Sequence, residues 1–275
     1  MVAAEVTCPV SDEQIVIGID IAASRPCTAV ALSCGRTARA VAWMAALPSD
    51  DPAADDTPAM LDWIEHLEPA AVAVDAPQGY NRRLLARSRG PAASRSRVCD
   101  YELLRRRISL YRVPSRADVA ADPSRLRPWM RVGFRYFKEL KKRGFEAPPD
   151  GALAGAFGRP PAVLEVFPYA SFVTLLGGLL SKKSAREGLR LRVLALREAG
   201  VHWDTGDDAY FDHDSLDALA TALTAWRFVQ GRAHPVGDER EGLIWLPVTR
   251  DEFGDRPFAP LPPAPRPQPG EGARR

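Results

Sequence analysis

The sequence predicts an α/β domain in which a mixed β-sheet is flanked by helices. Three strand-like runs follow one another closely near the start of the chain, and a helical stretch then leads to a short, wholly apolar run. Farther along, strand-like and helical segments alternate, which is typical of α/β proteins. With 275 residues, of which 46% are hydrophobic and 26% charged, the chain can bury a full core.

The first half of the predicted sheet is an antiparallel meander. Its three runs are joined by short turns and cover residues 15–22, 27–34 and 38–46. A helix is expected over 58–67, because Leu61, Ile64 and Leu67 recur at helical spacing. The run 71–75 has no alternating polar residues, so we expect a central parallel strand buried on both faces. A meander, a helix and a buried parallel strand form the opening of an RNase H-like domain.

A basic segment then interrupts this pattern. Between residues 78 and 150 there are 19 Lys and Arg against 7 Asp and Glu, and aromatic residues lie among them. Helices are expected near 99–108 and 128–143. We therefore predict an inserted, mostly helical basic subdomain over about 78–158.

The core is expected to resume after this insertion and to close the domain. The expected strands are 162–166 and 243–246, and the expected helices are 169–177, 184–199 and 214–230. Together these elements make a single RNase H-like domain over 14–250. The termini, 1–13 and 256–275, are expected to be disordered, the latter because it is rich in proline.

Two classes of protein are disfavoured by composition. No apolar run approaches the ~20 residues that cross a membrane, and the first residues do not read as a secretory signal, so we expect a cytoplasmic protein without a membrane partner. The four cysteines, Cys8, Cys27, Cys34 and Cys99, show no C-x-x-C spacing, so they are interpreted as free thiols rather than zinc ligands.

Five acidic residues form the candidate catalytic set: Asp20, Asp75, Asp214, Asp217 and Glu165. Asp20 and Asp75 each end an apolar strand, while Asp214 and Asp217 lie in the first turns of the helix expected at 214–230. A carboxylate at the end of a buried strand is costly to desolvate, so it needs a strong partner such as a cation. Small residues accompany each acid: Gly18 shares a strand face with Asp20, and the helix presents Ala218 next to its acids.

The set predicts a site for divalent cations. Neighbouring strands lie ~4.8 Å apart, so carboxylates at their ends can share a pair of ions. Asp20, Asp75 and Asp217 are the predicted ligands, and carboxylate ligation favours Mg²⁺ or Mn²⁺. The alternative for each residue taken alone is structural, in which Asp20 and Asp75 cap strands and Asp214 caps a helix.

Other polar residues could in principle contribute to this site. Glu165 lies inside an apolar strand, where it is either an additional ligand or the partner of an arginine from the basic segment. The acids Asp207, Asp208 and Asp212 are interpreted as solvated loop residues, and His213 as a surface residue.

In sequence the chain resembles domain of unknown function family 429 (DUF429), a family of predicted nucleases with an RNase H-like fold. The segments that carry the resemblance are Gly18–Asp20, Val74–Pro77 with Gly79, Arg97–Asp100 with Leu103–Arg105, Leu164–Pro168, His213–Ala218, and Gly237–Asp238 with Gly242–Ile244 and Pro247. They extend over about 15–250. The resemblance implies nuclease activity, although Asp20 is followed by Ile21-Ala22-Ala23-Ser24 instead of a glycine-rich continuation.

Nucleic acid, either DNA or RNA, is the partner that the basic segment suggests. Arginines with interleaved aromatics can follow a phosphate backbone and stack on bases, whereas solvated helix faces are the alternative explanation. The strongest candidates for phosphate contacts are Arg82, Arg83, Arg97, Arg105, Arg112 and Arg116, with Lys182 and Lys183 in addition. Of these, Arg82, Arg97, Arg112 and Lys183 are taken as the substrate-binding set.

The leading hypothesis is therefore a metal-dependent phosphodiesterase, that is, a nuclease. The main alternative is a non-catalytic protein that binds nucleic acid or protein and retains the core. Sugar kinases and actin-like phosphotransferases share this core, but they need two copies of it and glycine-rich phosphate loops, and the chain has one meander.

Overall fold

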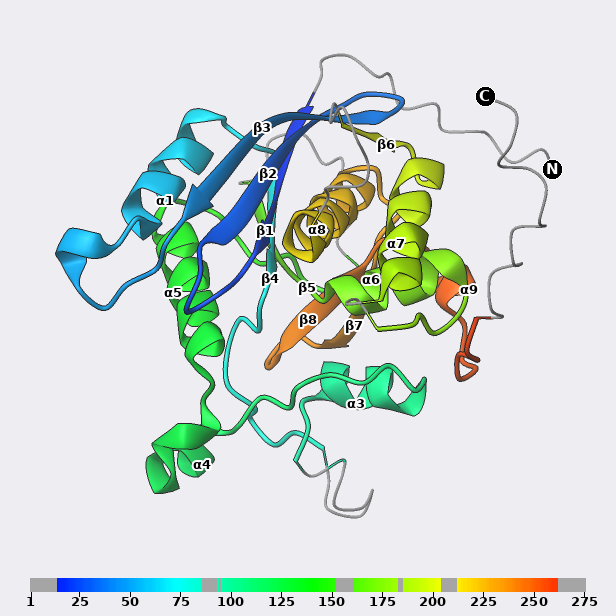
Figure 1. Ribbon diagram of the computed structural model, residues 1–275. Coiled ribbons are helices and arrows are strands. Elements are labelled where there is room, and N and C mark those ends of the chain that lie inside the picture. The colour runs from blue at the N-terminus through cyan, green and yellow to red at the C-terminus, as the bar shows by residue number, and fades with distance from the viewer. Residues whose placement is uncertain are drawn as a thin grey trace, which may run out of the picture.

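The computed structural model describes residues 14–85, 93, 95–151, 161–182, 185–203 and 212–261. These residues form one eight-stranded sheet flanked by helices (Figure 1). In chain order the strands are β1 (Gln14–Asp20), β2 (Cys27–Cys34), β3 (Ala38–Ala46), β4 (Ala71–Asp75), β5 (Ala162–Val166), β6 (Val201–His202), β7 (His234–Asp238) and β8 (Gly242–Leu246). Across the sheet their order is β6-β3-β2-β1-β4-β5-β8-β7.

The strand directions confirm the predicted fold class. β1, β2 and β3 form an antiparallel meander, whereas β1, β4, β5 and β8 run parallel to one another. This is the mixed sheet of an RNase H-like domain. The edge strands β6 and β7 were not predicted; β6 has only two residues, and β7 contains Pro235.

Every expected helix is present, with ends that differ from the expected ones by at most three residues, and two further short helices accompany them. They are α1 (Thr57–His66), α3 (Val98–Arg105), α4 (Arg116–Ala121), α5 (Pro128–Lys142), α6 (Pro168–Leu176), α7 (Arg186–Glu198), α8 (His213–Val229) and α9 (Arg250–Phe253). The short helices α4 and α9 were not predicted. Each begins with a capping box, formed by Ser115 with Asp118 and by Thr249 with Glu252.

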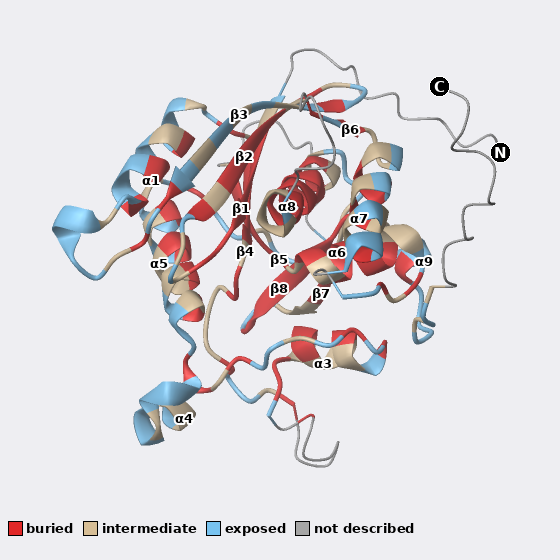
Figure 2. Cartoon of the chain, viewed as in Figure 1, coloured by how far each residue is buried: buried red, intermediate tan, exposed pale blue. Residues whose placement is uncertain are grey.

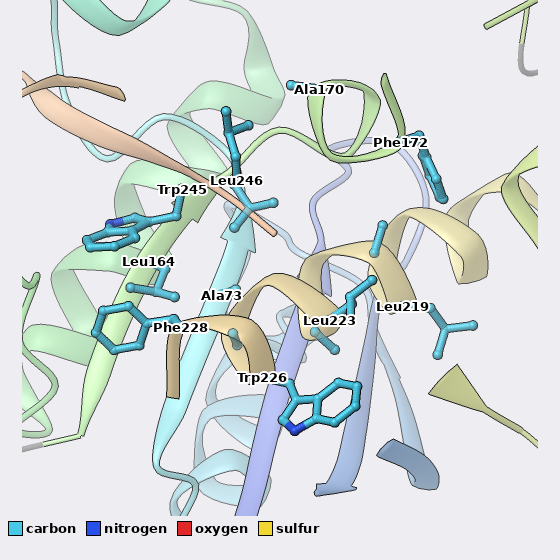
Figure 3. Close-up of a cluster of buried hydrophobic side chains, with 14 of the residues drawn as sticks. Ala73, Leu164, Ala170, Phe172, Leu219, Leu223, Trp226, Phe228, Trp245 and Leu246 are labelled. Atoms are coloured by element: carbon cyan, nitrogen blue, oxygen red, sulfur yellow. The ribbon is translucent and has the colours of Figure 1, made fainter. Parts of the chain in front are cut away.

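Two apolar clusters cover the two faces of the sheet. Val16 and Ala73 belong to a cluster with residues of α6, α7 and α8, while Ile17 and Val74 belong to a cluster with residues of α1 and α5. These two groups of helices lie on opposite sides of the sheet (Figure 1). This alternation is the period-two pattern of strands buried on both sides. α8 is buried over most of its surface (Figure 2), and its Leu223 and Trp226 belong to the cluster drawn in Figure 3.

α8 lies unusually close to the central strand because of Gly18. A Cβ atom built on Gly18 would collide with the backbone nitrogen of Ala222 and the carbonyl oxygen of Ala218. The helix therefore rests backbone to backbone on β1, which confirms the small-residue face predicted for it. Since Asp20 lies two residues beyond Gly18, on the same face of the strand, this contact brings the start of α8 toward Asp20.

The described helices of the insertion between β4 and β5 pack on the core of the domain. Cys99 and Leu103 of α3 belong to the cluster on the α8 face, and Tyr136 and Phe137 of α5 belong to the cluster on the opposite face. The apolar sides of α3 and α5 therefore contribute to the two clusters that cover the sheet. The described part of the insertion adds only a small cluster of its own around Met130.

Residues 256–261, the first part of the tail expected to be disordered, are described by the structure and contact the rest of the domain. The N–H of Leu179 donates to the carbonyl of Ala259 at 2.8 Å, and the N–H of Leu261 donates to the carbonyl of Leu179 at 3.0 Å. Phe258 and Leu261 pack against the core, an apolar contribution that the proline content obscured. The remainder of that tail, 262–275, and the expected leader, 1–13, lie outside the described residues.

The described cysteines, Cys27, Cys34 and Cys99, are free and buried, whereas Cys8 lies outside the described residues. Burial raises the pKa of Cys27 to about 11 and that of Cys34 to about 12, so both are neutral thiols at physiological pH. In the part of the chain that the structure describes, no helix is both long enough and apolar enough to cross a membrane.

Candidate functional site

Asp20 and Asp75 lie side by side at the ends of the two central strands. They are register partners on the parallel strands β1 and β4. Partners in a parallel pair point to the same face, so both carboxylates project toward the α8 side. Asp20 is 3% exposed, while Asp75 is half-buried at the rim.

The first turns of α8 bring two more acids to this edge. Asp212 caps the helix, since its carboxylate accepts from the N–H of Ser215 at 2.7 Å. Asp214 is therefore not the N-cap, and its side chain is 15% exposed. Asp217 is buried one turn farther along the helix.

Arg25 joins the strand acids to the helix acids. It lies in the turn between β1 and β2, and its guanidinium forms an ion pair with Asp214 and a second one with Asp20 at 3.4 Å. A cation thus already occupies the space between these carboxylates. The Arg25 side chain is 42% exposed, so water also reaches it.

A second arginine, Arg192 of α7, interacts electrostatically with Asp217. Arg192 is buried, with its Nη1 donating to the carbonyl of Gly188 at 2.7 Å and its guanidinium 5.3 Å from the ring centre of Phe172. Burial lowers the pKa of Arg192, and the negative charge of Asp217 offsets part of that effect. The carboxylate site, defined as Asp20, Asp75, Asp214 and Asp217, therefore has a positive charge on two sides.

The donor atoms of the carboxylate site are of the type that Mg²⁺ and Mn²⁺ prefer. One oxygen of Asp214, Oδ1, is buried and makes no hydrogen bond to the described residues, although His213 Nε2 lies 3.2 Å away. The arrangement itself is not that of a metal centre. Across the described ranges, no three His, Cys, Asp or Glu side chains are close enough together to hold a metal ion. The residues fit a divalent ion in charge and donor type. They fit it in geometry only if the side chains draw together and the Arg25 guanidinium moves away.

Glu165 is engaged in a different cluster. Its carboxylate accepts from Arg97 at 2.6 and 2.9 Å and from the N–H of Gln78 at 2.9 Å. Arg97 is 1% exposed and also donates to Asp100 at 2.8 Å. Burial alone would lower the pKa of Arg97, but the charges of Asp100 and Glu165 raise it well above its ordinary value. Of the two alternatives for Glu165, the structure shows the pairing with an arginine.

Strand register explains why Glu165 is separated from the other acids. Glu165 is the partner of Val74, not of Asp75. Val74 faces α1 and α5, so Glu165 projects from the opposite face to that of Asp20 and Asp75. Glu165 therefore does not join the carboxylate site.

The predicted phosphate ligands have different surroundings. Arg82 and Arg112 are exposed, as phosphate contacts require. Arg97 is buried in its ion pairs, so it cannot contact a phosphate from solvent, and the prediction for this residue is wrong. Lys183 lies outside the described residues, as do Asp207 and Asp208. Arg82 lines a cleft of about 740 Å³, whose walls come from the segment after β4, from α4 and α5, and from the β7–β8 turn.

Comparison with known protein families shows which family the chain belongs to. The model of the family described as "Protein of unknown function (DUF429)" matches residues 18–242. The chain belongs to the DUF429 family. All four acids of the carboxylate site in this DUF429 protein fall within the matched region, and so does the cleft.

Other comparisons are more distant. No curated protein matches the sequence of this DUF429 protein. Among solved structures, T. thermophilus RuvC in complex with a Holliday junction substrate is similar over 78% of this chain and 93% of its own, with 14% sequence identity and a TM-score of 0.36. Such a likeness is too distant to assign residues of the site.

Two residues of the site were missed by sequence reasoning. Arg25 stands in a turn with no motif around it, and only the fold shows that it reaches back to Asp20 and across to Asp214. Arg192 belongs to a helix rich in arginine, where nothing in the sequence separates a buried arginine from its exposed neighbours. No sequence pattern around either arginine indicates its role.

Proposed function

We propose that the protein is a divalent-metal-dependent nuclease whose carboxylate site holds the ions. The observation that carries the proposal is the pairing of Asp20 with Asp75 in register on adjacent parallel strands, with the start of α8 brought over the same edge. Mg²⁺ or Mn²⁺ bound there would activate a water molecule and stabilise the leaving oxygen of a phosphodiester. Asp20, Asp75 and Asp217 would be the ligands, with Asp214 in support.

The protein's own residues have three tasks in this proposal. The strand ends keep Asp20 and Asp75 at a fixed spacing, because both belong to the rigid centre of the sheet. α8 brings its acids to them through the contact at Gly18. Arg25 neutralises the acids while no ion is bound, and its released guanidinium can pair with a substrate phosphate, because two phosphate oxygens accept a bidentate pair of N–H bonds as the two oxygens of a carboxylate do.

Cleavage assays test this proposal directly. Purified protein should cleave single-stranded DNA, RNA or a branched DNA when Mn²⁺ is added, and Asp20→Asn should lower the rate by about 100-fold or more. Asp62→Asn is the matched control, because Asp62 is an exposed aspartate on α1 paired with Arg143. Cleavage that persists in Asp20→Asn, or that disappears equally in Asp62→Asn, contradicts the assignment.

One observation favours a second candidate function, a nucleic-acid-binding or protein-binding protein without catalysis. Arg25 already compensates Asp20 and Asp214, and the described acids do not converge as metal ligands do. In such a protein the arginine would permanently replace the ion.

Metal titration separates the two candidates. Calorimetry with Mn²⁺ at millimolar concentration should detect binding to the wild type and tighter binding to Arg25→Gln, because the variant lacks the competing guanidinium. If neither protein binds Mn²⁺, the nuclease proposal fails and the non-catalytic function is the one supported.

A further inference from the structure

The cleft that Arg82 lines is separate from the carboxylate site. It lies beside residues 78–83, which follow β4 as the chain runs from the sheet toward α3 and α4 (Figure 1). At about 740 Å³ its volume falls within the range of small-ligand pockets, so a single nucleotide fits into it. Its lining includes five cations: Arg82, Arg83, Arg116, Lys141 and Arg240.

Three of these cations carry uncompensated charge. Arg83 is paired with Asp118 at 2.8 Å and Arg240 with Asp238 at 2.7 Å. Arg82, Arg116 and Lys141 form no ion pair with any residue in the described part of the chain, and all three are exposed.

Two acids, Glu239 and Glu241, also line the cleft, and the carboxylates of both accept backbone N–H groups; Glu239 is exposed and accepts from the N–H of Asp150 at 2.6 Å. Glu241 is buried, and its carboxylate accepts from the backbone N–H groups of Arg82 at 2.7 Å and Val98 at 2.9 Å. Its hydrogen bonds anchor the β7–β8 turn to the segment after β4 and leave little acceptor capacity for a ligand. The cleft therefore favours an anion.

The aromatic rings of Tyr80 and Phe134 lie near Arg116, one of the three cations that form no ion pair with a described residue. The rings of Tyr80 and Phe134 meet edge to face, with their centres 4.8 Å apart. The guanidinium of Arg116 lies 5.3 Å from the centre of the Tyr80 ring, and both rings are only half-buried. Aromatic rings and guanidinium planes are the surfaces on which unpaired bases stack.

We propose that this cleft binds a single strand of nucleic acid, with phosphates at Arg82, Arg116 and Lys141 and a base against Tyr80. The site deepens the proposed function by naming its substrate class, but binding requires neither metal nor Asp20. Gln78 on the cleft wall is three residues beyond Asp75, which limits the distance between their Cα atoms to about 11 Å. A strand a few nucleotides long that leaves the cleft on this side is long enough to span the distance from Gln78 to Asp75.

Binding is tested by fluorescence anisotropy in the presence of EDTA. EDTA removes the divalent ions, so binding is measured independently of cleavage. The probes are a labelled single strand of about 12 nucleotides, as DNA and as RNA, the same sequence as a duplex, and an abasic strand. The single strand should bind most tightly. The abasic strand should bind at least about fivefold more weakly, because it has no base to stack.

Variants divide the phosphate contacts from the base contact. Arg82→Ala and Lys141→Ala should each reduce the slope of log affinity against log salt by about 0.7, which corresponds to one lost phosphate contact on a single strand. Tyr80→Leu, which keeps an apolar side chain, should weaken binding at least about fivefold without changing the slope. Arg36→Ala is the matched control, because Arg36 is exposed in the β2–β3 turn at the opposite edge of the sheet.

Four results would overturn the proposal. They are a duplex that binds as tightly as the single strand, a mononucleotide that competes as well as the strand at equal nucleotide concentration, equal losses in Arg82→Ala and Arg36→Ala, and no binding of any strand at low salt. The second result would assign the cleft to a free nucleotide instead.

Discussion

Two arginine–carboxylate clusters, one at Glu165 on β5 and one at Asp20 on β1, are separated by β4 in this sheet, and their arginines differ greatly in burial. Arg97 is 1% exposed and donates to both Asp100 and Glu165. Arg25 is 42% exposed, and its nitrogen lies 3.4 Å from Asp20. An arginine that closes a buried network cannot leave without exposing uncompensated charge, whereas water can replace one at the rim. The first cluster is therefore part of the framework, and the second is open to exchange.

The largest expected effect comes from breaking the buried cluster. Arg97→Met should lower the free energy of unfolding by about 3–5 kcal/mol, because Asp100 and Glu165 would remain buried without their cation. Arg97→Lys should restore only part of the loss, since an ammonium cannot pair with both carboxylates in the same plane. Urea denaturation measures both, with the exposed Arg95→Met as control. An unchanged midpoint in Arg97→Met contradicts the structural role of this cluster.

An intermediate effect is expected at Gly18, which serves the carboxylate site and not the Arg97 cluster. Gly18→Ala forces α8 away from β1 and should cost about 1–3 kcal/mol of stability. It should also reduce Mn²⁺ binding, because Asp214 and Asp217 move with the helix. Gly35→Ala is a suitable control, since a Cβ there meets no atom within 4 Å. If both variants unfold alike, the close approach of α8 has no energetic consequence.

A smaller effect is expected from Arg25. Arg25→Gln should lower stability by at most about 1 kcal/mol in EDTA, as for other ion pairs at a protein surface. Raising the salt from about 0.05 to about 1 M should abolish most of this difference, while leaving that of Arg97→Met nearly unchanged. Denaturation at the two salt concentrations reports both values. A salt-resistant loss in Arg25→Gln would place Arg25 in the same class as Arg97.

The smallest expected effect concerns Asp118, which is paired with Arg83 beside the cleft. Hydrogen bonds from the hydroxyl and N–H of Ser115 lower the pKa of Asp118 to about 2 from an ordinary value of 3.8. A lowered pKa stabilises the folded state at pH above the ordinary value, and this stabilisation is lost as the pH falls toward 2. Asp118→Asn should therefore cost about 0.5 kcal/mol at neutral pH and progressively less below about pH 4.

Thermal unfolding of wild type and Asp118→Asn across this pH range provides the measurement. Asp50→Asn, an exposed loop substitution, is the control. A difference that stays constant down to pH 2 would show that the carboxylate charge of Asp118 does not support the cap of α4.

Much of the fold could be predicted because its signals are local. Apolar runs and helical spacing located β1 to β5 and the long helices, since each of these elements buries a regular face. The edge strands escaped prediction because two residues, or five including a proline, show no period. The packing of α3 and α5 on the core is known only once the sheet is assembled.

The candidate site was predictable only in part, for a similar reason. Asp20 and Asp75 end apolar strands, so their common edge follows from the strand directions. The separation of Glu165 depends on its pairing with Val74, and a shift of one residue would reverse its face. The reach of Arg25 depends on how a turn folds back over its own strand. Register and turn geometry are properties of the assembled sheet.

The position of Arg25 in a short turn also has a consequence in terms of concentration. A charged group tethered by a short, flexible segment is present at its binding site at an effective concentration on the order of millimolar. Any free cation that binds Asp20 and Asp214 must compete with this resident group. Under the proposed function the tether would set a threshold: below it the strand ends would hold an arginine, and above it they would be available to an ion. Arg25 would make the response of the molecule to divalent ions depend on their abundance.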